Sequence, residues 1–147
     1  MIAVIQRCSQ GKVTISDKVV GEISHGLVIL LGVHKNDTEN DAKFLVNKIC
    51  ELRIFNDEND KMNLSIKDVN GSALVISQFT LCGDTKKGRR PSFIKAATPD
   101  DGNRLYEYFM SEMKKSSVPI ESGEFGAMMD VELVNNGPVT FVLNSKD

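Results

Sequence analysis

The stretch MIAVIQRCSQGKVTISDKVVGEISHGLVILLGV, residues 1 to 33, decides the fold. Runs of β-branched and apolar residues alternate in it with polar or glycine-containing pairs, the pattern of strands joined by tight turns. Turns are expected at Gln10-Gly11 and Ser16-Asp17. Strands joined this closely predict an antiparallel meander. The expected strands are 2–9, 12–15, 19–23 and 26–33.

Two helices are expected after these strands. Thr38 and Thr98 are suitable N-cap residues, and Pro99 occupies the first helical position of the second helix, where a missing N–H costs nothing. Apolar residues then recur at the spacing of one helix face. They are Ala42, Leu45, Val46 and Ile49 in the first helix and Leu105, Phe109 and Met113 in the second.

The rest of the chain adds further strands. Ser77-Gln78-Phe79-Thr80-Leu81 continues one of them, a basic loop covers 82–92, and Asn135-Asn136-Gly137-Pro138 separates the last two. Strand segments outnumber helices and do not alternate regularly with them. An α+β fold with a mainly antiparallel sheet and two principal helices is therefore predicted. The additional strands are expected at 53–55, 72–76, 118–121, 129–134 and 139–143.

Length and composition are those of an ordinary globular protein. The chain has 147 residues, 41% hydrophobic and 26% charged, and we expect a single domain over 1–147. A formal charge of −2 excludes the global positive field of non-specific nucleic-acid binders. No window approaches the length of a membrane span, and the amino end does not resemble a leader. A cytoplasmic protein without membrane contact is expected.

Side chains for metal, redox or triad chemistry are sparse. Cys8, Cys50 and Cys82 form no C-x-x-C pair, which favours buried, inert thiols. Acidic residues lie scattered, in turns or in first helical turns, so neither a metal nor a cofactor is expected. His25 and His34 lie beside an apolar strand, and no spacing pairs either of them with a serine or cysteine. A histidine-based triad is therefore weakly supported.

The basic loop superficially resembles a phosphate-binding loop. Gly83 and Gly88 have the right spacing, but Arg89 and Arg90 replace the lysine and hydroxyl residues, and Pro91 follows where a helix should begin. A nucleotide site is thereby disfavoured. The cations of the loop suit a phosphate backbone, although a solvated loop is the simpler explanation. They are Lys86, Lys87, Arg89, Arg90 and Lys95.

Two segments depart from ordinary strands. Ser77-Gln78-Phe79-Thr80 ends an apolar strand with polar side chains, and polar strand ends are common. Gly137-Pro138 stands where a strand should begin, although proline donates no ladder hydrogen bond. A hairpin turn with an edge proline would explain this second segment.

These segments carry a resemblance to a known family. Ser77 to Leu81 and Asn135 to Thr140 are similar to two signatures of the D-aminoacyl-tRNA deacylases, formerly called D-tyrosyl-tRNA deacylases. Lys87 to Phe93 lies between them and resembles the family's G-x-R-P-S-F segment. The similarity covers 1–145 and departs at Asn136, where the family usually has aspartate, and at Met128, where aspartate is common.

The resemblance implies a barrel-like deacylase fold and hydrolysis of the ester bond of D-aminoacyl-tRNA, with mischarged glycyl-tRNA as a further candidate substrate. It also implies a cytoplasmic homodimer with active sites at the subunit interface. There Gly137-Pro138, as a cis peptide, would reach into the partner's pocket and exclude L side chains. The implied catalytic residues are Ser77, Gln78, Phe79 and Thr80, the implied substrate-binding residues are Arg7, Met129, Gly137 and Pro138, and the candidate tRNA-binding residues are Lys86, Lys87, Arg89 and Arg90.

Arg7 and Thr80 each leave two explanations open. Arg7 shares a strand face with Ala3 and Ile5; the resemblance implies that it hydrogen-bonds near the Gly-Pro turn, and an exposed strand end is the alternative. For Thr80 two mechanisms are open. In one, its hydroxyl attacks the ester itself. In the other, backbone N–H groups around Phe79 and Thr80 stabilise the oxyanion while water attacks, helped by the ribose 2′-hydroxyl. We favour the backbone mechanism, because no base accompanies Thr80.

Three rival functions fit the same sequence less well. Deacylases that edit L-amino acids share the fold, and Arg7 favours the D-specific class. A nucleic-acid-binding protein is a second rival, which the charge of −2 disfavours. An esterase for free amino-acid esters is the third, and it would not need the tRNA end of the substrate.

Overall fold

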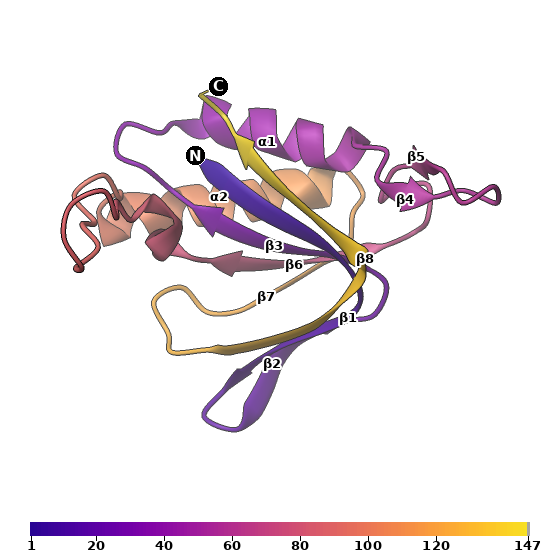
Figure 1. Cartoon of the computed structure of the whole chain (residues 1–147), viewed down its shortest axis with the longest axis horizontal. Helices are drawn as coiled ribbons and strands as arrows, with labels where there is room; N and C mark the ends of the chain where they lie inside the picture. Colours follow the sequence, from indigo (N-terminus) through magenta and orange to yellow (C-terminus); the bar gives the residue numbers. More distant parts are fainter. Residues whose placement is uncertain (147) are drawn as a thin grey trace.

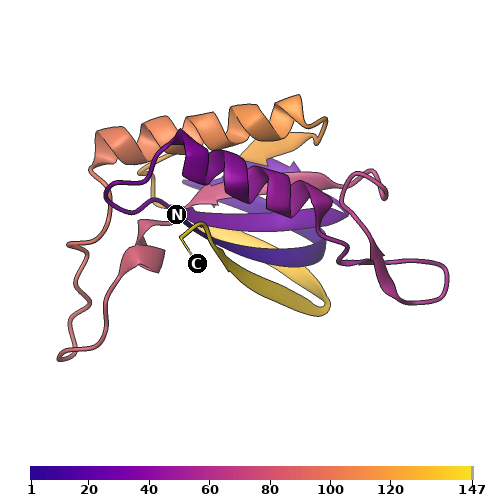
Figure 2. The ribbon, with the colours of Figure 1, turned by 90° about the horizontal axis from the view of Figure 1, so that it is seen from above.

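The computed structural model describes residues 1–146 and shows a curved mixed sheet with two α-helices, α1 and α2, on one face (Figure 1). These helices run side by side above the strands (Figure 2). Within residues 1–146 no helix is long and apolar enough to cross a membrane. The elements are β1 (Ile2–Ile15), β2 (Lys18–Ile23), β3 (Gly26–Gly32), α1 (Glu39–Glu51), β4 (Phe55–Asn56), β5 (Met62–Leu64), β6 (Ser72–Ser77), the 3-10 helix η1 (Phe79–Cys82), α2 (Pro99–Lys115), β7 (Ile120–Ser122) and β8 (Asp130–Asn144).

Strand β1 organises the sheet and does not belong to a meander. Its first half pairs antiparallel with β3 and its second half with β2. The register continues from Cys8↔Gly26 to Gly11↔Ile23, so β2 and β3 follow one another along one edge of β1. Strand β8 pairs along the other edge. The predicted meander is therefore wrong, because β2 does not separate β1 from β3.

The turn predicted at Gln10-Gly11 is also wrong, since β1 is continuous through it. A Cβ on Gly11 would lie 2.9 Å from Val28 Cγ2, so this glycine allows close packing of strands and does not mark a turn. The turn predicted at Ser16-Asp17 is confirmed, and both residues have positive φ.

Helical crossovers make part of the sheet parallel. Helix α1 connects β3 to β6 and α2 connects β6 to β7, and both strand pairs are parallel, as such long connections allow. Three antiparallel pairings, of β1 with β2, β3 and β8, nevertheless outnumber these two in the main sheet of residues 1–146. The predicted mainly antiparallel α+β fold is confirmed.

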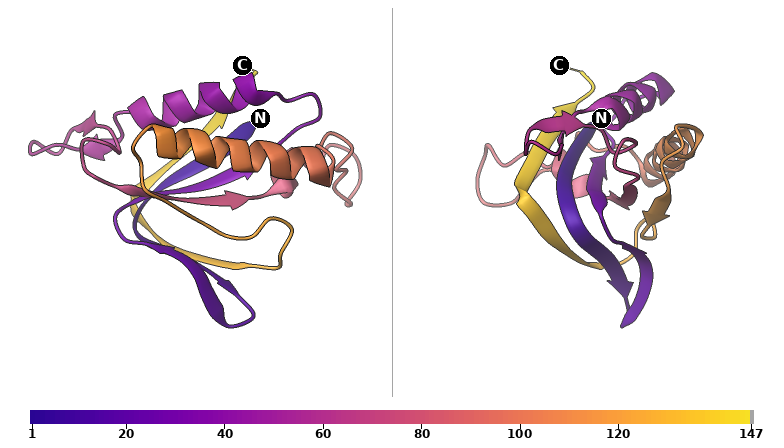
Figure 3. Two further views of the ribbon diagram at one scale, coloured as in Figure 1. Left: turned by 180° about the vertical axis from the view of Figure 1, so that it is seen from behind. Right: turned by 90° about the vertical axis from the view of Figure 1, so that its right-hand side faces the viewer.

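Curvature gives the sheet its barrel-like shape (Figure 3). It brings β2 so close to β7 that a Cβ on Gly21 would lie 2.6 Å from the Ser122 carbonyl oxygen. Apolar side chains fill both faces of β3, which explains its unbroken apolar sequence. Leu27 and Ile29 pack under the helices, and Val28 packs on the opposite face with Leu74 and Ile76.

The helices have the predicted caps and buried faces. Thr38 and Thr98 are the N-caps. Two predicted strands are shifted: the one at 53–55 becomes β4, and the one at 118–121 becomes β7. The predicted core residues Ala42, Leu45, Val46, Ile49, Leu105, Phe109 and Met113 are all buried.

Strand β8 is continuous where the sequence predicted two strands and a turn. Thr140 pairs with Gln6 and Asn135 pairs with Cys8, so residues 136–139 bulge out of register opposite Arg7. The predicted hairpin turn is wrong, because β8 continues through these residues. The bulge accommodates Pro138, which donates no ladder hydrogen bond. Within the bulge the Gly137–Pro138 peptide is cis, and Gly137 has φ 142°, a region that favours glycine.

Candidate active site

A pocket of about 570 Å³ opens where β6 ends. Its walls come from η1, the segment that precedes α2, the first turns of α2 and the β7–β8 loop. In Figure 1 these segments gather at the left-hand end of the molecule. The structure thus brings together predicted site residues from distant parts of the chain. They are Ser77, Gln78, Phe79, Thr80 and Met129.

The backbone turns sharply at this point. The Gln78 N–H still donates to the Leu31 carbonyl at 2.8 Å, and η1 begins at the next residue. The Leu81 N–H donates back to the Gln78 carbonyl at 3.2 Å. The N–H groups of Phe79 and Thr80 have no acceptor among residues 1–146, as expected for the first amides of a helical turn. Two adjacent backbone donors are therefore available to a ligand.

No titratable side chain of residues 1–146 lines the pocket. Gln78 Nε2 donates to Thr80 Oγ1 at 3.2 Å, so an amide, and not a base, contacts the Thr80 hydroxyl. The two histidines lie elsewhere: His25 packs against Phe55 with ring centroids 5.3 Å apart, and burial together with the positive amino terminus lowers the pKa of His34. Within the part of the chain that the structure describes, Thr80 has no partner that would make it a strong nucleophile.

An exposed aromatic pair stands at the mouth of the pocket. The Phe79 and Phe93 rings meet edge to face with centroids 5.0 Å apart, and Phe79 is 57% exposed. Met128, in the β7–β8 loop, is 91% exposed. Sequence reasoning missed Phe93 and Met128 as pocket residues, although an aromatic residue at the end of a basic loop was a usable signal.

Phe125 is another lining residue that sequence reasoning missed. It packs on Gly102 of α2, where an added Cβ would lie 3.2 Å from Phe125 Cζ. A glycine inside an otherwise regular helix was the signal, because it weakens the helix unless a neighbour needs the space.

The basic loop projects beside the pocket. Asp84 and Ser92 close its base through paired backbone hydrogen bonds of 2.8 and 2.9 Å. Lys95 pairs with Asp84 at 3.7 Å and is thereby partly neutralised. The other cations are exposed and form no ion pair with an acid of residues 1–146. They are the predicted Lys86, Lys87, Arg89 and Arg90.

Arg7 braces the bulge of β8 from within the protein. It is only 6% exposed, which excludes the alternative of a solvated strand end. Its Nε donates to the Asn136 carbonyl at 2.9 Å, and its Nη1 donates to the Ile54 carbonyl and to Asn56 Oδ1, both at 3.0 Å. Asn135 Oδ1 accepts from the Val139 N–H at 2.7 Å and closes the bulge from the other side.

The structure does not bring this bulge to the pocket of the same chain. Arg7, Gly137 and Pro138 are absent from the lining. In Figure 1 the middle of β8 bends at the right-hand end of the main sheet, far from the segment between β6 and α2 on the left. The predicted site residues of one chain therefore form two separate groups.

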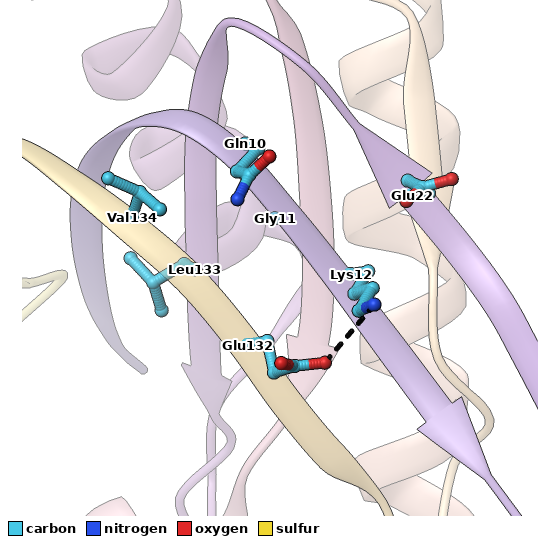
Figure 4. Close-up of a pocket in the computed structure, with 7 residues that line it drawn as sticks. All are labelled: Gln10, Gly11, Lys12, Glu22, Glu132, Leu133 and Val134. Carbon is cyan, nitrogen blue, oxygen red and sulfur yellow. Dashed lines mark ion pairs between the residues drawn. The ribbon is translucent and has the colours of Figure 1, made fainter. Parts of the chain in front are cut away.

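Two other hollows of the described chain contain none of the predicted site residues. One, of about 550 Å³, lies between α2 and β7. The other, of about 180 Å³, lies between β1, β2 and β8, and the ion pair of Lys12 with Glu132, at 3.4 Å, spans it (Figure 4). No three His, Cys, Asp or Glu residues among 1–146 could together hold a metal ion. The three thiols are buried as predicted, and burial raises the pKa of Cys8 to about 11.

The fold and pocket define a small α+β protein with free backbone donors at a strand end, beside a cationic loop. Residues 4–144 match the profile of the family described as D-Tyr-tRNA(Tyr) deacylase, and the chain belongs to that family. It is 55% identical to the D-aminoacyl-tRNA deacylase of Thermosipho africanus over 99% of this chain and 98% of that protein. It is 53% identical to that of Bacillus cytotoxicus, over 99% and 100%.

Solved structures share the same fold. The c-Myc DNA unwinding element binding protein superposes with a TM-score of 0.93 at 36% identity, over 98% of both chains. A probable eukaryotic D-amino acid tRNA deacylase superposes with a TM-score of 0.82 over 97% of this chain and 98% of the other. At 17% identity the second likeness shows the fold alone.

Proposed function

We propose that the protein hydrolyses the ester bond of D-aminoacyl-tRNA, releases the free D-amino acid and tRNA, and thereby proofreads chirality in translation. The two relatives named D-aminoacyl-tRNA deacylase, each more than half identical over nearly their whole length, support this activity. The observation that carries it is the pocket itself, which offers the free Phe79 and Thr80 amides and no acid or base among residues 1–146.

Such a pocket suits ester hydrolysis by water. The ester carbonyl oxygen accepts from the Phe79 and Thr80 N–H groups, which stabilise the oxyanion after water adds to the carbonyl carbon. The carbon–oxygen bond to the terminal ribose then breaks, and the neighbouring 2′-hydroxyl assists the proton transfer. Each well-placed donor contributes roughly 2.7–4 kcal/mol to the transition state, so no nucleophilic side chain is required.

The tRNA end lies, in this proposal, across the mouth of the pocket. Lys86, Lys87, Arg89 and Arg90 contact its phosphates, which suits their exposure and their freedom from ion pairs within residues 1–146. The exposed pair of Phe79 and Phe93 offers a stacking surface for an unpaired base, worth roughly 1–3 kcal/mol per base. Met129, in the pocket wall, contacts the aminoacyl group.

The chirality filter comes from a second copy of the chain. Gly137 and Pro138 cannot serve their own pocket, because they do not line it and the middle of β8 lies far from it. In a homodimer their carbonyl oxygens enter the partner's pocket and exclude an L side chain. Strand β8 supports this assembly, because it pairs only with β1 within residues 1–146 and exposes apolar side chains. They are Val131, Val134, Phe141 and Val142.

The remaining parts of the proposal concern the setting of the activity. Residues 1–147 act as one domain, without cofactor or metal, in the cytoplasm where aminoacyl-tRNA is made. Mischarged glycyl-tRNA is a further candidate substrate, because a filter that excludes an L side chain tolerates hydrogen at that position.

Ester loss from labelled tRNA tests the function. The protein is incubated with D-tyrosyl-, L-tyrosyl- and glycyl-tRNA, each with and without a chelator. Rapid release from the D substrate, little from the L substrate and no effect of the chelator are expected. Equal rates on the D and L substrates, or complete inhibition by the chelator, would refute the proposal.

Nucleic-acid binding without hydrolysis is the second candidate. The structure with a TM-score of 0.93 is described as a DNA unwinding element binding protein, and the basic loop here is exposed. The formal charge of −2 disfavours it. A binding protein of that kind would bind duplex DNA and uncharged tRNA with similar affinity and leave the aminoacyl ester intact.

A further inference from the structure

The amino terminus is buried and charged. The α-ammonium group of Met1 lies 2.8 Å from Asp37 Oδ2, and the side chains of both residues are 0% exposed. The ammonium also donates to Ser145 Oγ at 2.9 Å. Removing one member of a buried ion pair leaves the other charge uncompensated, which is far more disruptive than removing both. The chemical state of this amino group therefore matters to Asp37.

Asp37 shapes the turn that precedes α1. Its Oδ2 accepts from the His34 N–H at 2.7 Å, and its own N–H donates to the His34 carbonyl at 3.2 Å. Its Oδ1 is buried and accepts no hydrogen bond from residues 1–146, and Lys146 Nζ lies 3.9 Å from that oxygen. The Lys146 side chain is 56% exposed, so the Met1 ammonium is the principal counterion.

This turn holds one wall of the pocket. The Lys35 N–H donates to the Lys95 carbonyl at 2.8 Å, and the Ala97 N–H donates to the Val33 carbonyl at 2.9 Å. His34 and Ala96 form a β-bridge between these bonds. Residues 96–98 and Val33 line the pocket. A continuous set of contacts thus runs from the amino group to the pocket wall.

We propose that Asp37, paired with the free α-ammonium of Met1, is a positioning residue for the pocket wall at residues 96–98. The pocket reaches its binding geometry only while that amino group is unmodified, because a formyl or acetyl group removes the charge and leaves the buried Asp37 carboxylate without its principal counterion. The expected change in KM rests on the proposed function, whereas the expected change in hydrogen exchange at the pocket wall does not.

Two single changes test the proposal, Asp37→Asn and an N-formylated chain obtained by expression in bacteria with peptide deformylase inhibited. Each is expected to speed hydrogen exchange at the Lys35 and Ala97 amides by about tenfold or more through local opening. Each should also raise KM for D-tyrosyl-tRNA by about tenfold while kcat changes less than about twofold, since uniform binding is lost. Asp68→Asn is the matched control, because Asp68 closes a similar turn on Ser65 and no residue next to that turn lines the pocket.

Combining both changes removes both charges, and we expect exchange at Ala97 to return toward the unmodified value. Additive effects in the combined chain, or unchanged exchange and KM in both single changes, would overturn the proposal. If Asp37→Asn does not fold, the formylated chain decides alone, and unchanged exchange at Ala97 overturns the proposal. Failure of the proposed function is distinguishable, because the unmodified chain would then release no D-amino acid while the exchange response persists.

Discussion

The pocket at the end of β6 and the bulge in the middle of β8 use side chains in opposite ways. In the pocket the free groups are backbone amides, and the side chains around them carry no titratable group among residues 1–146. In the bulge the backbone is unusual and a buried guanidinium fixes it, through bonds from Arg7 to Asn136, Ile54 and Asn56. One region presents free backbone donors, and the other presents a backbone segment held in place by a side chain.

This difference indicates where each region is vulnerable. Chemistry that depends on backbone amides tolerates a change of side chain, provided that the local turn survives. A filter that depends on a fixed backbone conformation fails when its brace is removed, even if the backbone residues themselves are unchanged. Substitutions in the bulge should therefore cost more than substitutions of the most obvious nucleophile.

Arg7→Met should have the largest effect, because it removes three charge-assisted hydrogen bonds and takes the guanidinium donor from the buried Ile54 carbonyl. We expect a loss of about 3 kcal/mol in the free energy of unfolding, measured by urea denaturation. The D-over-L ratio of ester hydrolysis should fall as well, as the bulge relaxes. Lys12→Met is the control, since Lys12 lies on the same strand in an exposed ion pair with Glu132 and should cost under about 1 kcal/mol. Similar losses in the two variants would contradict the role of Arg7.

Asp41→Asn should have a smaller effect on the free energy of unfolding. Burial raises the pKa of Asp41, but hydrogen bonds from Thr38, Ser145 and Lys146 outweigh it and lower the pKa to about 2. A carboxyl group whose pKa is lower in the folded state stabilises that state at pH values above its pKa in the unfolded chain, which is near 4. This stabilisation is lost as the pH falls through about 2. The wild type should therefore exceed the variant by about 2 kcal/mol at pH 7 and converge with it near pH 2.

Denaturation curves from pH 7 to pH 2 measure this convergence. Asp57→Asn is the comparison variant, because a hydrogen bond from the Lys61 N–H lowers the pKa of Asp57 as well, but in an exposed turn. Its difference from wild type should be smaller at every pH. A difference between wild type and Asp41→Asn that stays constant down to pH 2 would show that the charge of Asp41 is not what stabilises the fold.

Thr80→Ala should have the smallest effect. Its backbone N–H remains, so the rate of D-tyrosyl-tRNA hydrolysis should fall less than about tenfold, or about 1.4 kcal/mol. Single-turnover kinetics gives this rate, and mass spectrometry of the quenched reaction detects any covalent aminoacyl adduct. An adduct on Thr80, or a loss of several orders of magnitude, would mean that its hydroxyl is the nucleophile.

Local patterns predicted the elements that depend on local chemistry. The helix caps at Thr38 and Thr98, the buried helix faces and the apolar strands were predictable, because periodicity reflects burial directly. The turns predicted at Gln10-Gly11 and Asn135 to Pro138 failed for a shared reason. Glycine and proline also occur inside strands where chains pack closely or bulge, and only the neighbouring strand distinguishes these cases.

The candidate site was predictable in part. The resemblance indicated Ser77 to Thr80 and Met129, and the structure places them in one pocket. The free amides of η1 could not be deduced, because no residue pattern marks which N–H groups a turn leaves unpaired. Gly102 inside α2 signalled that some neighbour needs the space, but the sequence did not identify Phe125, 23 positions away, as that neighbour. The ion pair of Met1 with Asp37 joins residues 36 positions apart, and no local pattern marks it.

Complementation between two defective chains tests most directly whether chemistry and selectivity come from different subunits. Gly137→Val distorts the filter, because a Cβ at Gly137 would lie 2.6 Å from Val139 Cγ2 at φ 142°. Ala96→Trp fills the pocket that Ala96 lines. Each variant alone should lack D-selective hydrolysis. After unfolding together and refolding at equal concentrations, half of the dimers are mixed and each contains one intact site. About one quarter of wild-type D-selective hydrolysis should therefore return, above the activity of the Gly137→Val homodimers measured alone. No recovery, or D-selective hydrolysis by Gly137→Val alone, would contradict a filter that acts across the subunit interface.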